Sequence, residues 1–187
     1  MSKYILFCLF IFSSIIGFSQ TANITGVIRT HSGTLIPNVT VTLKSINFER
    51  RVLTDETGRY LFSEVPTGAI YTVEPELEGV PVNGVSTFDL VQMLDHIGVF
   101  MVLETDVEQL AADLDQSGTV SVRDAWLLRN LILGVSTTLD VPTWRFVPLD
   151  YSYPDAITPQ TFTLGQNTEN INFFGVKAGD VNGSDQF

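Results

Sequence analysis

The stretch Val39-Thr40-Val41-Thr42-Leu43-Lys44 alternates apolar and polar side chains. A period of two places one set of side chains on each face of a β-strand, one toward a core and one toward water. Short runs rich in β-branched and aromatic residues stand on either side of it, at Asn23–Ile28, Tyr60–Phe62 and Ile70–Val73. Turn signals containing Gly, Pro, Asn and Asp separate these runs. Regular short strands with turns between them predict a β-sandwich over residues 20–76.

The turn residues and strand residues of this half also occur in an order that resembles the carboxypeptidase regulatory-like domain family. The residues that carry the resemblance are Gly26-Val27-Ile28, Gly33, Ile36–Val41, Thr54-Asp55, Gly58–Phe62, Val65–Gly68 and Tyr71–Val73. That family is a transthyretin-like β-sandwich repeated in many bacterial surface proteins. The resemblance implies a fold and a spacer or recognition role, without catalysis.

Past Pro81 the apolar period changes to the spacing typical of helices. One stripe recurs every third residue and consists of Phe88, Val91, Leu94 and Ile97. A second stripe consists of Val122, Ala125, Trp126, Leu128, Leu131 and Ile132. Gly98 and Gly134 stand where a C-cap would end each helix, and 106–112 adds a shorter helical segment. We therefore expect a helical module over residues 80–138.

After the helical module the sequence again has the pattern of β-strands. Candidate strands are Trp144–Val147, Thr161–Leu164 and Ile171–Val176, and prolines interrupt the stretch. We expect this 139–187 tail to pack on the helical module. The predicted fold class is mixed β and α, with a transthyretin-like sandwich followed by a dockerin-like helical calcium module and a β-rich tail.

A twelve-residue segment, Asp113–Asp124, precedes the second helical stripe. It has oxygen-bearing side chains at positions 1, 3 and 5, glycine at position 6 and a carboxylate at position 12, which is the spacing of an EF-hand-type calcium loop. The predicted ligands are Asp113, Asp115, Ser117, the carbonyl of Thr119, Ser121 directly or through water, and Asp124. A capping box would explain Ser121 and Asp124 without a metal. It would not explain the alternating oxygens ahead of a glycine.

The loop and the following Ala125–Gly134 resemble a dockerin type I repeat, which is a calcium loop plus one helix. Dockerins carry two repeats, and Asn83–Leu90 resembles the other one only in part. Gly84 to Asp89 is five steps, whereas Gly118 to Asp124 is six.

The segment Gly179–Ser184 resembles the opening half of such a loop, but no helix follows it. Our hypothesis is that Asp180 and Asn182 return to the first repeat. There they would either join Asp89 in a second calcium site or cap the module without metal.

The dockerin resemblance also implies a protein partner, cohesin-like or another surface protein. Family members use loop positions 10 and 11 and the helices for recognition, which here are Val122, Arg123, Arg129 and Asn130. The alternative is that Val122 packs and the other three form a solvated face.

The net charge and the N-terminal segment indicate which partners and which location to expect. The net charge is −11, with 21 acidic and 10 basic residues, which excludes nucleic acid as a natural partner because phosphates need Lys and Arg. Residues 1–19 have the anatomy of a secretory signal peptide, with Lys3 before an apolar run too short for a comfortable membrane span. Cys8 is the one cysteine and lies in that segment, so we expect a secreted or cell-surface chain without disulfides, thiolate metal sites or a mature membrane span.

The sequence lacks the local motifs of common enzyme classes, and no catalytic residue is predicted. Only His31 and His96 offer imidazole bases, and both stand near expected turns or helix ends. The predicted function is a secreted, non-catalytic, calcium-binding module for protein docking or cell-surface assembly. The alternative is a carbohydrate-binding accessory module linked to polysaccharide degradation. Its sugar-stacking residues would be Trp144, Phe146, Tyr151 and Tyr153.

Overall fold

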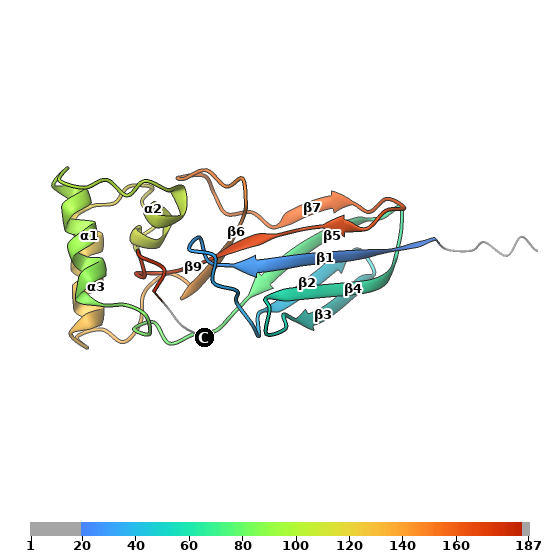
Figure 1. Cartoon of the computed structure of the whole chain (residues 1–187), viewed down its shortest axis with the longest axis horizontal. Helices are drawn as coiled ribbons and strands as arrows, with labels where there is room; N and C mark the ends of the chain where they lie inside the picture. Colours follow the sequence, from blue (N-terminus) through green and yellow to red (C-terminus); the bar gives the residue numbers. More distant parts are fainter. Residues whose placement is uncertain (1–19, 185–187) are drawn as a thin grey trace, which may run out of the picture.

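The computed structural model describes residues 20–184, so the expected signal peptide at 1–19 lies outside the described residues. Two β-sheets face each other, and three helices lie together at one end of the strands (Figure 1). The strands are β1 (Thr21–Arg29), β2 (Thr40–Ser45), β3 (Phe48–Leu53), β4 (Arg59–Pro66), β5 (Ile70–Glu76), β6 (Trp144–Pro148), β7 (Gln160–Thr163), β8 (Glu169–Asn170) and β9 (Phe173–Lys177). The helices are α1 (Thr87–Ile97), α2 (Asp106–Ala112) and α3 (Val122–Ile132).

The first sheet has the strand order β4-β1-β9-β6, with β8 also pairing with β1. β1 is antiparallel to β4 and parallel to β8 and β9. The second sheet has the order β3-β2-β5-β7 and is antiparallel throughout. Mixed β and α structure with sandwich-like sheets is therefore confirmed.

The tail has a wider role than the sequence predicted. Val141, Ala178 and Val181 do pack on the helical module, but all the strands of the tail belong to the sandwich. The physical reason is that β1 and β5 would otherwise expose rows of unpaired N–H and C=O groups at sheet edges. A parallel β1–β9 pair also needs a long crossover connection, which the intervening chain with its helices supplies. The sandwich therefore extends beyond residues 20–76, and the helical module is inserted within it.

Alternation builds the sandwich core. In β1 every second residue from Ala22 to Ile28 is buried, as the period of two requires. The core cluster comprises Ala22, Ile24, Ile28, Ile36, Val39, Val41, Leu43, Tyr60, Phe62, Val65, Tyr71, Val73, Trp144, Phe146, Leu164 and Phe173. Residues from both halves of the chain meet in it, so neither half buries this core alone.

Each helix begins with a capping box. The N-caps are Ser86, Thr105 and Ser121, and in each case an acidic residue three positions later accepts from the cap's backbone N–H. α1 and α3 pack on each other over a second cluster formed by Met93, Leu103, Ala112, Leu114, Leu128, Val141, Ala178 and Val181. α2 lies against β6 and β9 through a third cluster, which connects the helices to the sandwich.

The helices lie where the apolar periods predict them, but α1 presents a different face to the core. Phe88, Val91 and Leu94 are exposed, whereas Asp89 and Met93 are buried. Asp89 accepts hydrogen bonds from the backbone of the C-terminal segment, and this contact requires the acidic face to point inward. No helix in residues 20–184 is long and apolar enough to cross a membrane.

Candidate metal centre

The loop between α2 and α3 is folded back on itself. α2 ends with Asp113 as its C-cap, and α3 begins after Ser121 as its N-cap. Gln116 and Gly118 have φ angles of 55° and 78°, in the left-handed region, and they reverse the chain between the two helix ends. The first and last positions of the loop are thereby brought together.

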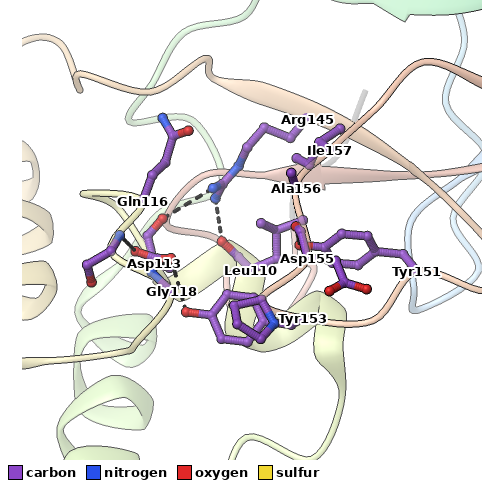
Figure 2. Close-up of a pocket in the computed structure, with 12 residues that line it drawn as sticks. Leu110, Asp113, Gln116, Gly118, Arg145, Tyr151, Tyr153, Asp155, Ala156 and Ile157 are labelled. Atoms are coloured by element: carbon purple, nitrogen blue, oxygen red, sulfur yellow. Dashed lines mark hydrogen bonds between the residues drawn. The ribbon is translucent and has the colours of Figure 1, made fainter.

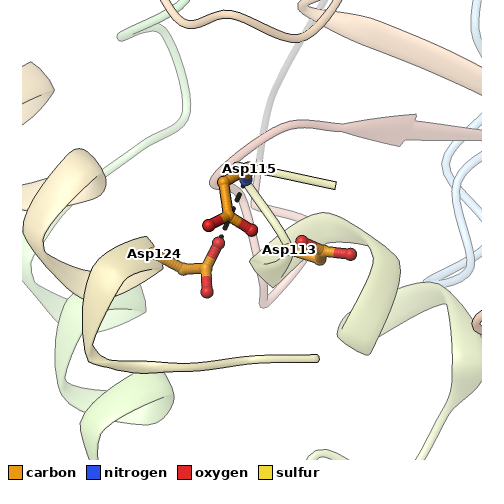
Figure 3. Close-up of side chains that lie close together, drawn as sticks. All are labelled: Asp113, Asp115 and Asp124. Atoms are coloured by element: carbon orange, nitrogen blue, oxygen red, sulfur yellow. Dashed lines mark hydrogen bonds between the residues drawn. The ribbon is translucent and has the colours of Figure 1, made fainter. Parts of the chain in front are cut away.

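Asp113, Asp115 and Asp124 converge at this point (Figure 3). Each offers one carboxylate oxygen, and these oxygens all lie within 4.8 Å of one another. Calcium binds oxygen ligands at about 2.3–2.6 Å, so one ion can contact three oxygens with this separation. Asp124 is fully buried and Asp113 is 3% exposed. Because buried like charges repel, this arrangement favours a bound cation.

Asp124 serves two purposes at once. Its Oδ2 accepts from the backbone N–H and the hydroxyl of Ser121, both at 2.9 Å, which completes the capping box of α3. Its Oδ1 accepts from the backbone N–H groups of Leu114 at 2.8 Å and Asp115 at 3.1 Å. The cap and the convergent carboxylates therefore coexist, and the two interpretations of the sequence do not exclude each other.

Backbone donors hold the other two carboxylates. Asp113 accepts from the N–H groups of Ser117 and Gly118 at 3.1 and 3.0 Å. Asp115 accepts from the N–H of Ser117 at 3.1 Å and pairs with Arg123 at 2.8 Å. Hydrogen bonding from Ser117, reinforced by the charge of Arg123, lowers the pKa of Asp115. The loop is thus built to hold Asp113 and Asp115 in place, and it favours the ionised form of Asp115.

The remaining predicted ligands lie in the same loop. Ser117 donates its hydroxyl to the carbonyl oxygen of Thr119 at 3.1 Å, so these two oxygens are adjacent. The hydroxyl of Ser121 donates to Asp124 and accepts from the N–H of Arg123 at 3.2 Å. Ser121 therefore acts first as the helix cap.

A hollow of about 590 Å³ lies against the outer side of this loop (Figure 2). Among its lining residues, the buried Arg145 donates to the carbonyls of Leu110 and Asp113. Burial lowers the pKa of Arg145 to about 10, and the neighbouring Asp113 opposes this shift. Tyr153 donates its hydroxyl to Asp113 at 3.0 Å, and burial together with this bond raises its pKa. The sequence did not reveal these contacts with Asp113, because they span 32 and 40 residues and have no local signature.

The proposed aromatic platform for sugar rings is corrected by the structure. Trp144 and Phe146 are buried in the sandwich core, where their rings stack with a centroid distance of 6.5 Å. Tyr151 and Tyr153 are half-buried and pack against the cluster around α2. The first four residues of β6 are all buried, so its two aromatic residues do not form an open surface.

The residues expected to form a second site are brought together. The backbone N–H groups of Val181 and Asn182 donate to Asp89 Oδ1 at 3.0 and 3.3 Å, so the C-terminal segment does reach the start of α1. Asp89 is fully buried and Asp180 is 4% exposed. The contact spans 92 residues of sequence between Val181 and Asp89.

Three of the four expected partner-binding residues are exposed, namely Val122, Arg123 and Arg129. The prediction for Asn130 is wrong, because only 8% of this residue is exposed. Its backbone carbonyl accepts from the N–H groups of Val135 and Ser136, so the chain that follows α3 folds over it.

The two histidines are engaged in other contacts. His96 accepts at Nδ1 from the backbone N–H of Leu103 at 3.0 Å, and His31 lies 3.9 Å from Glu108. Within residues 20–184, the group formed by Asp113, Asp115 and Asp124 is the one cluster of at least three potential metal-ligating acidic, His or Cys side chains.

Comparison with known proteins finds similarity to parts of the chain. No curated protein matches the chain. The C-terminal fragment of the pilus adhesin SpaC from Lactobacillus rhamnosus GG is 11% identical, with a TM-score of 0.29, over 35% of this chain and 27% of that one. A structure that carries the name of a carbohydrate-binding protein from Bacteroides uniformis is 22% identical, with a TM-score of 0.27, over 30% of each chain. The present chain thus spans less than a third of the length of either.

A family model matches residues 23–91, from β1 to the first turns of α1. The match confirms the first of the two resemblances found in the sequence, and the loop at 113–124 lies outside it. Residues 23–91 are therefore similar to the carboxypeptidase regulatory-like domain, a non-catalytic regulatory fold.

Proposed function

We propose that the chain is a secreted, non-catalytic calcium-binding module that docks a protein partner in assembly at the cell surface. The observation that carries the proposal is the convergence of three carboxylate oxygens within 4.8 Å in the loop 113–124. Hard oxygen ligands of this kind suit calcium, and the loop adds the carbonyl of Thr119 and the hydroxyl of Ser117 nearby.

The position of the loop gives calcium a structural role. The loop joins the end of α2 to the start of α3, and its carboxylates come from both ends. A cation held between Asp113 and Asp124 would therefore fix the two helices relative to each other. Binding that favours the folded state stabilises it by mass action.

The exposed apolar residues of α1 and α3 support a docking role. Phe88 is 60% exposed and Trp126 is 58% exposed, and Val122 stands beside Arg123 at the start of α3. Large apolar side chains gathered on one module are a common feature of surfaces that bind other proteins. A calcium-ordered helix pair would present these side chains in a fixed arrangement.

Calorimetric titration of residues 20–187 with calcium tests the metal part of this proposal. We expect Asp124→Asn to remove binding at the loop, because it removes a buried ligand charge. The matched control is Asp150→Asn, the same change at an exposed aspartate outside the loop, which should titrate like the unaltered chain. Equal calcium binding in all three proteins would overturn the assignment.

Affinity capture from the surface fraction of the source cells tests the docking part. A partner should bind in calcium and be released by chelator, and Trp126→Asp should abolish its capture. Ile46→Asp is the control, because Ile46 is 96% exposed in the turn between β2 and β3, away from the helices. The captured protein is then purified and must bind the unaltered chain with a defined stoichiometry, and failure to do so would contradict docking.

A further inference from the structure

The C-terminal segment and the start of α1 together repeat the hydrogen bonding of the loop 113–124. In that loop, Asp124 Oδ1 accepts from two consecutive backbone N–H groups, at 2.8 and 3.1 Å. At the start of α1, Asp89 Oδ1 also accepts from two consecutive N–H groups, those of Val181 and Asn182, at 3.0 and 3.3 Å. Asp89 Oδ2 is held by the N–H and hydroxyl of Ser86, as Asp124 Oδ2 is held by Ser121.

The opening half of the loop has a counterpart as well. Asp113 Oδ1 accepts from the N–H of Ser117 four residues later, at 3.1 Å, and Asp180 Oδ1 accepts from the N–H of Ser184 at 2.9 Å. Gly183, with φ of 65°, occupies the left-handed position that Gln116 holds in the loop, with φ of 55°. Asp180, Asn182 and Ser184 thus stand in the places of Asp113, Asp115 and Ser117.

One further contact aligns the two halves. Ser117 donates its hydroxyl to the Thr119 carbonyl at 3.1 Å, and Ser184 donates its hydroxyl to the Gly84 carbonyl at 3.1 Å. Gly84 therefore corresponds to Thr119 and not to Gly118, and each lies five residues before its aspartate. This register explains why the stretch before α1 looks one residue short in the sequence.

The packing beneath the two halves follows the same register. Leu114 and Val181 are both buried in the second cluster. Leu128 and Met93 are buried there too, and each lies four residues after the aspartate that caps its helix. The helical module is thus internally duplicated, and one copy of the loop is split. Its opening half comes from the C-terminal segment and its closing half from the chain before α1.

A second observation at the split loop points to a ligand. Asn182 Oδ1 is buried, and among the described residues no group donates to it. The corresponding Asp115 carboxylate receives an N–H from Ser117 and pairs with Arg123. A buried hydrogen-bond acceptor without a donor costs free energy of folding unless a cation or a water molecule lies against it. The buried carboxylates of Asp89 and Asp180 add two negative charges at the same place.

The geometry points to a second divalent-cation site, of calcium type, bound by Asp89, Asp180 and Asn182 with the Gly84 carbonyl and Ser184. Its ligands come from the start of the helical module and from the C-terminal segment, so the ion would hold that segment against the start of α1. The choice of calcium rests on the function proposed for the loop 113–124, since both sites present the same oxygen types. The site itself rests on its own contacts.

Calcium titration of residues 20–187 and its variants tests the second site. The unaltered chain should bind two ions, and Asp180→Asn should bind one. Asp124→Asn should also bind one, whereas Asp150→Asn should bind two. A chain that binds one ion, loses it with Asp124→Asn and keeps it with Asp180→Asn overturns the second site and leaves the proposed function intact. The reverse pattern supports the split site and overturns the loop, and no binding overturns both.

Asn182→Leu guards against a variant that fails to fold. Because Asn182 Oδ1 has no donor, its removal should not lower the melting temperature in chelator. In calcium, the same variant should bind the second ion at least about tenfold more weakly. Unchanged affinity for both ions would overturn the role of Asn182.

Discussion

Gly26 illustrates how one residue limits the packing of the first sheet. A Cβ at this position would lie 1.9 Å from the carbonyl oxygen of Ile171 and 2.5 Å from the ring of Tyr60. Neither group has room to move, because Tyr60 donates its hydroxyl to that same carbonyl. We expect Gly26→Ala to lower the free energy of unfolding by about 3 kcal/mol or more, measured by urea denaturation. Gly165→Ala is the control, since its Cβ would meet nothing within 4 Å, and an equal loss there would contradict the steric cause.

The two tyrosines beside the loop each donate a hydrogen bond, one in a partly buried setting and one at the surface. Tyr153 donates to Asp113 at 3.0 Å in a partly buried setting, whereas Tyr151 donates to the exposed carbonyl of Asp155. Tyr153→Phe should lower the free energy of unfolding in chelator by about 1 kcal/mol, because Asp113 loses a donor. Tyr151→Phe should change it by less than about 0.5 kcal/mol. Thermal or urea unfolding of the pair measures both, and equal effects would count against the role of Tyr153.

At this scale the sequence predicts what lies close along the chain and misses what lies far apart. The spacing of Asp113, Asp115 and Asp124 is a local property, and the structure brings these three residues together as predicted. The contacts of Arg145 and Tyr153 with Asp113 depend on how the tail returns. No periodicity records such a contact, so it becomes visible only in three dimensions.

Among the elements, helix positions are predictable and helix faces are less so. The apolar period placed α1 correctly but suggested that Phe88, Val91 and Leu94 face the core, whereas they are exposed. β3 was not predicted, because this strand at the edge of its sheet is mostly exposed and lacks alternation. An exposed edge strand and an exposed apolar helix face both weaken the patterns from which structure is inferred.

The N-caps of α2 and α3 are expected to differ in their effect on calcium binding. Ser121→Ala and Thr105→Ala should each lower the free energy of unfolding in chelator by about 1 kcal/mol, because each removes an N-cap oxygen. Only Ser121→Ala should also weaken calcium binding, since Ser121 orients Asp124. Urea denaturation and calorimetric titration measure the two effects. If the α2 cap variant weakened calcium binding as much as the α3 cap variant, the link between cap and loop would be wrong.

For the whole molecule, the sizes of the clusters predict the order in which its parts unfold. Sixteen buried residues form the sandwich core, whereas eight form the cluster between the helices. A cluster that small depends on additional ligation, and two buried groups of carboxylates oppose its folding without a cation. The helices are nevertheless inserted between β5 and β6, so both ends of the module are held by the sandwich. Loss of calcium should therefore loosen the helical module while the sheets persist.

Spectroscopy of a Trp126→Phe variant makes this order measurable, because Trp144 in the sandwich core is then the one tryptophan of the chain. In chelator, the helical circular-dichroism signal should be lost at a lower temperature than the Trp144 fluorescence signal. In calcium, the two transitions should move together, since the cation ties α2 to α3 and α2 packs on β6 and β9. Coincident transitions in chelator would mean that the third cluster alone couples the helices to the sandwich. Calcium would then stabilise the chain as a single cooperative unit.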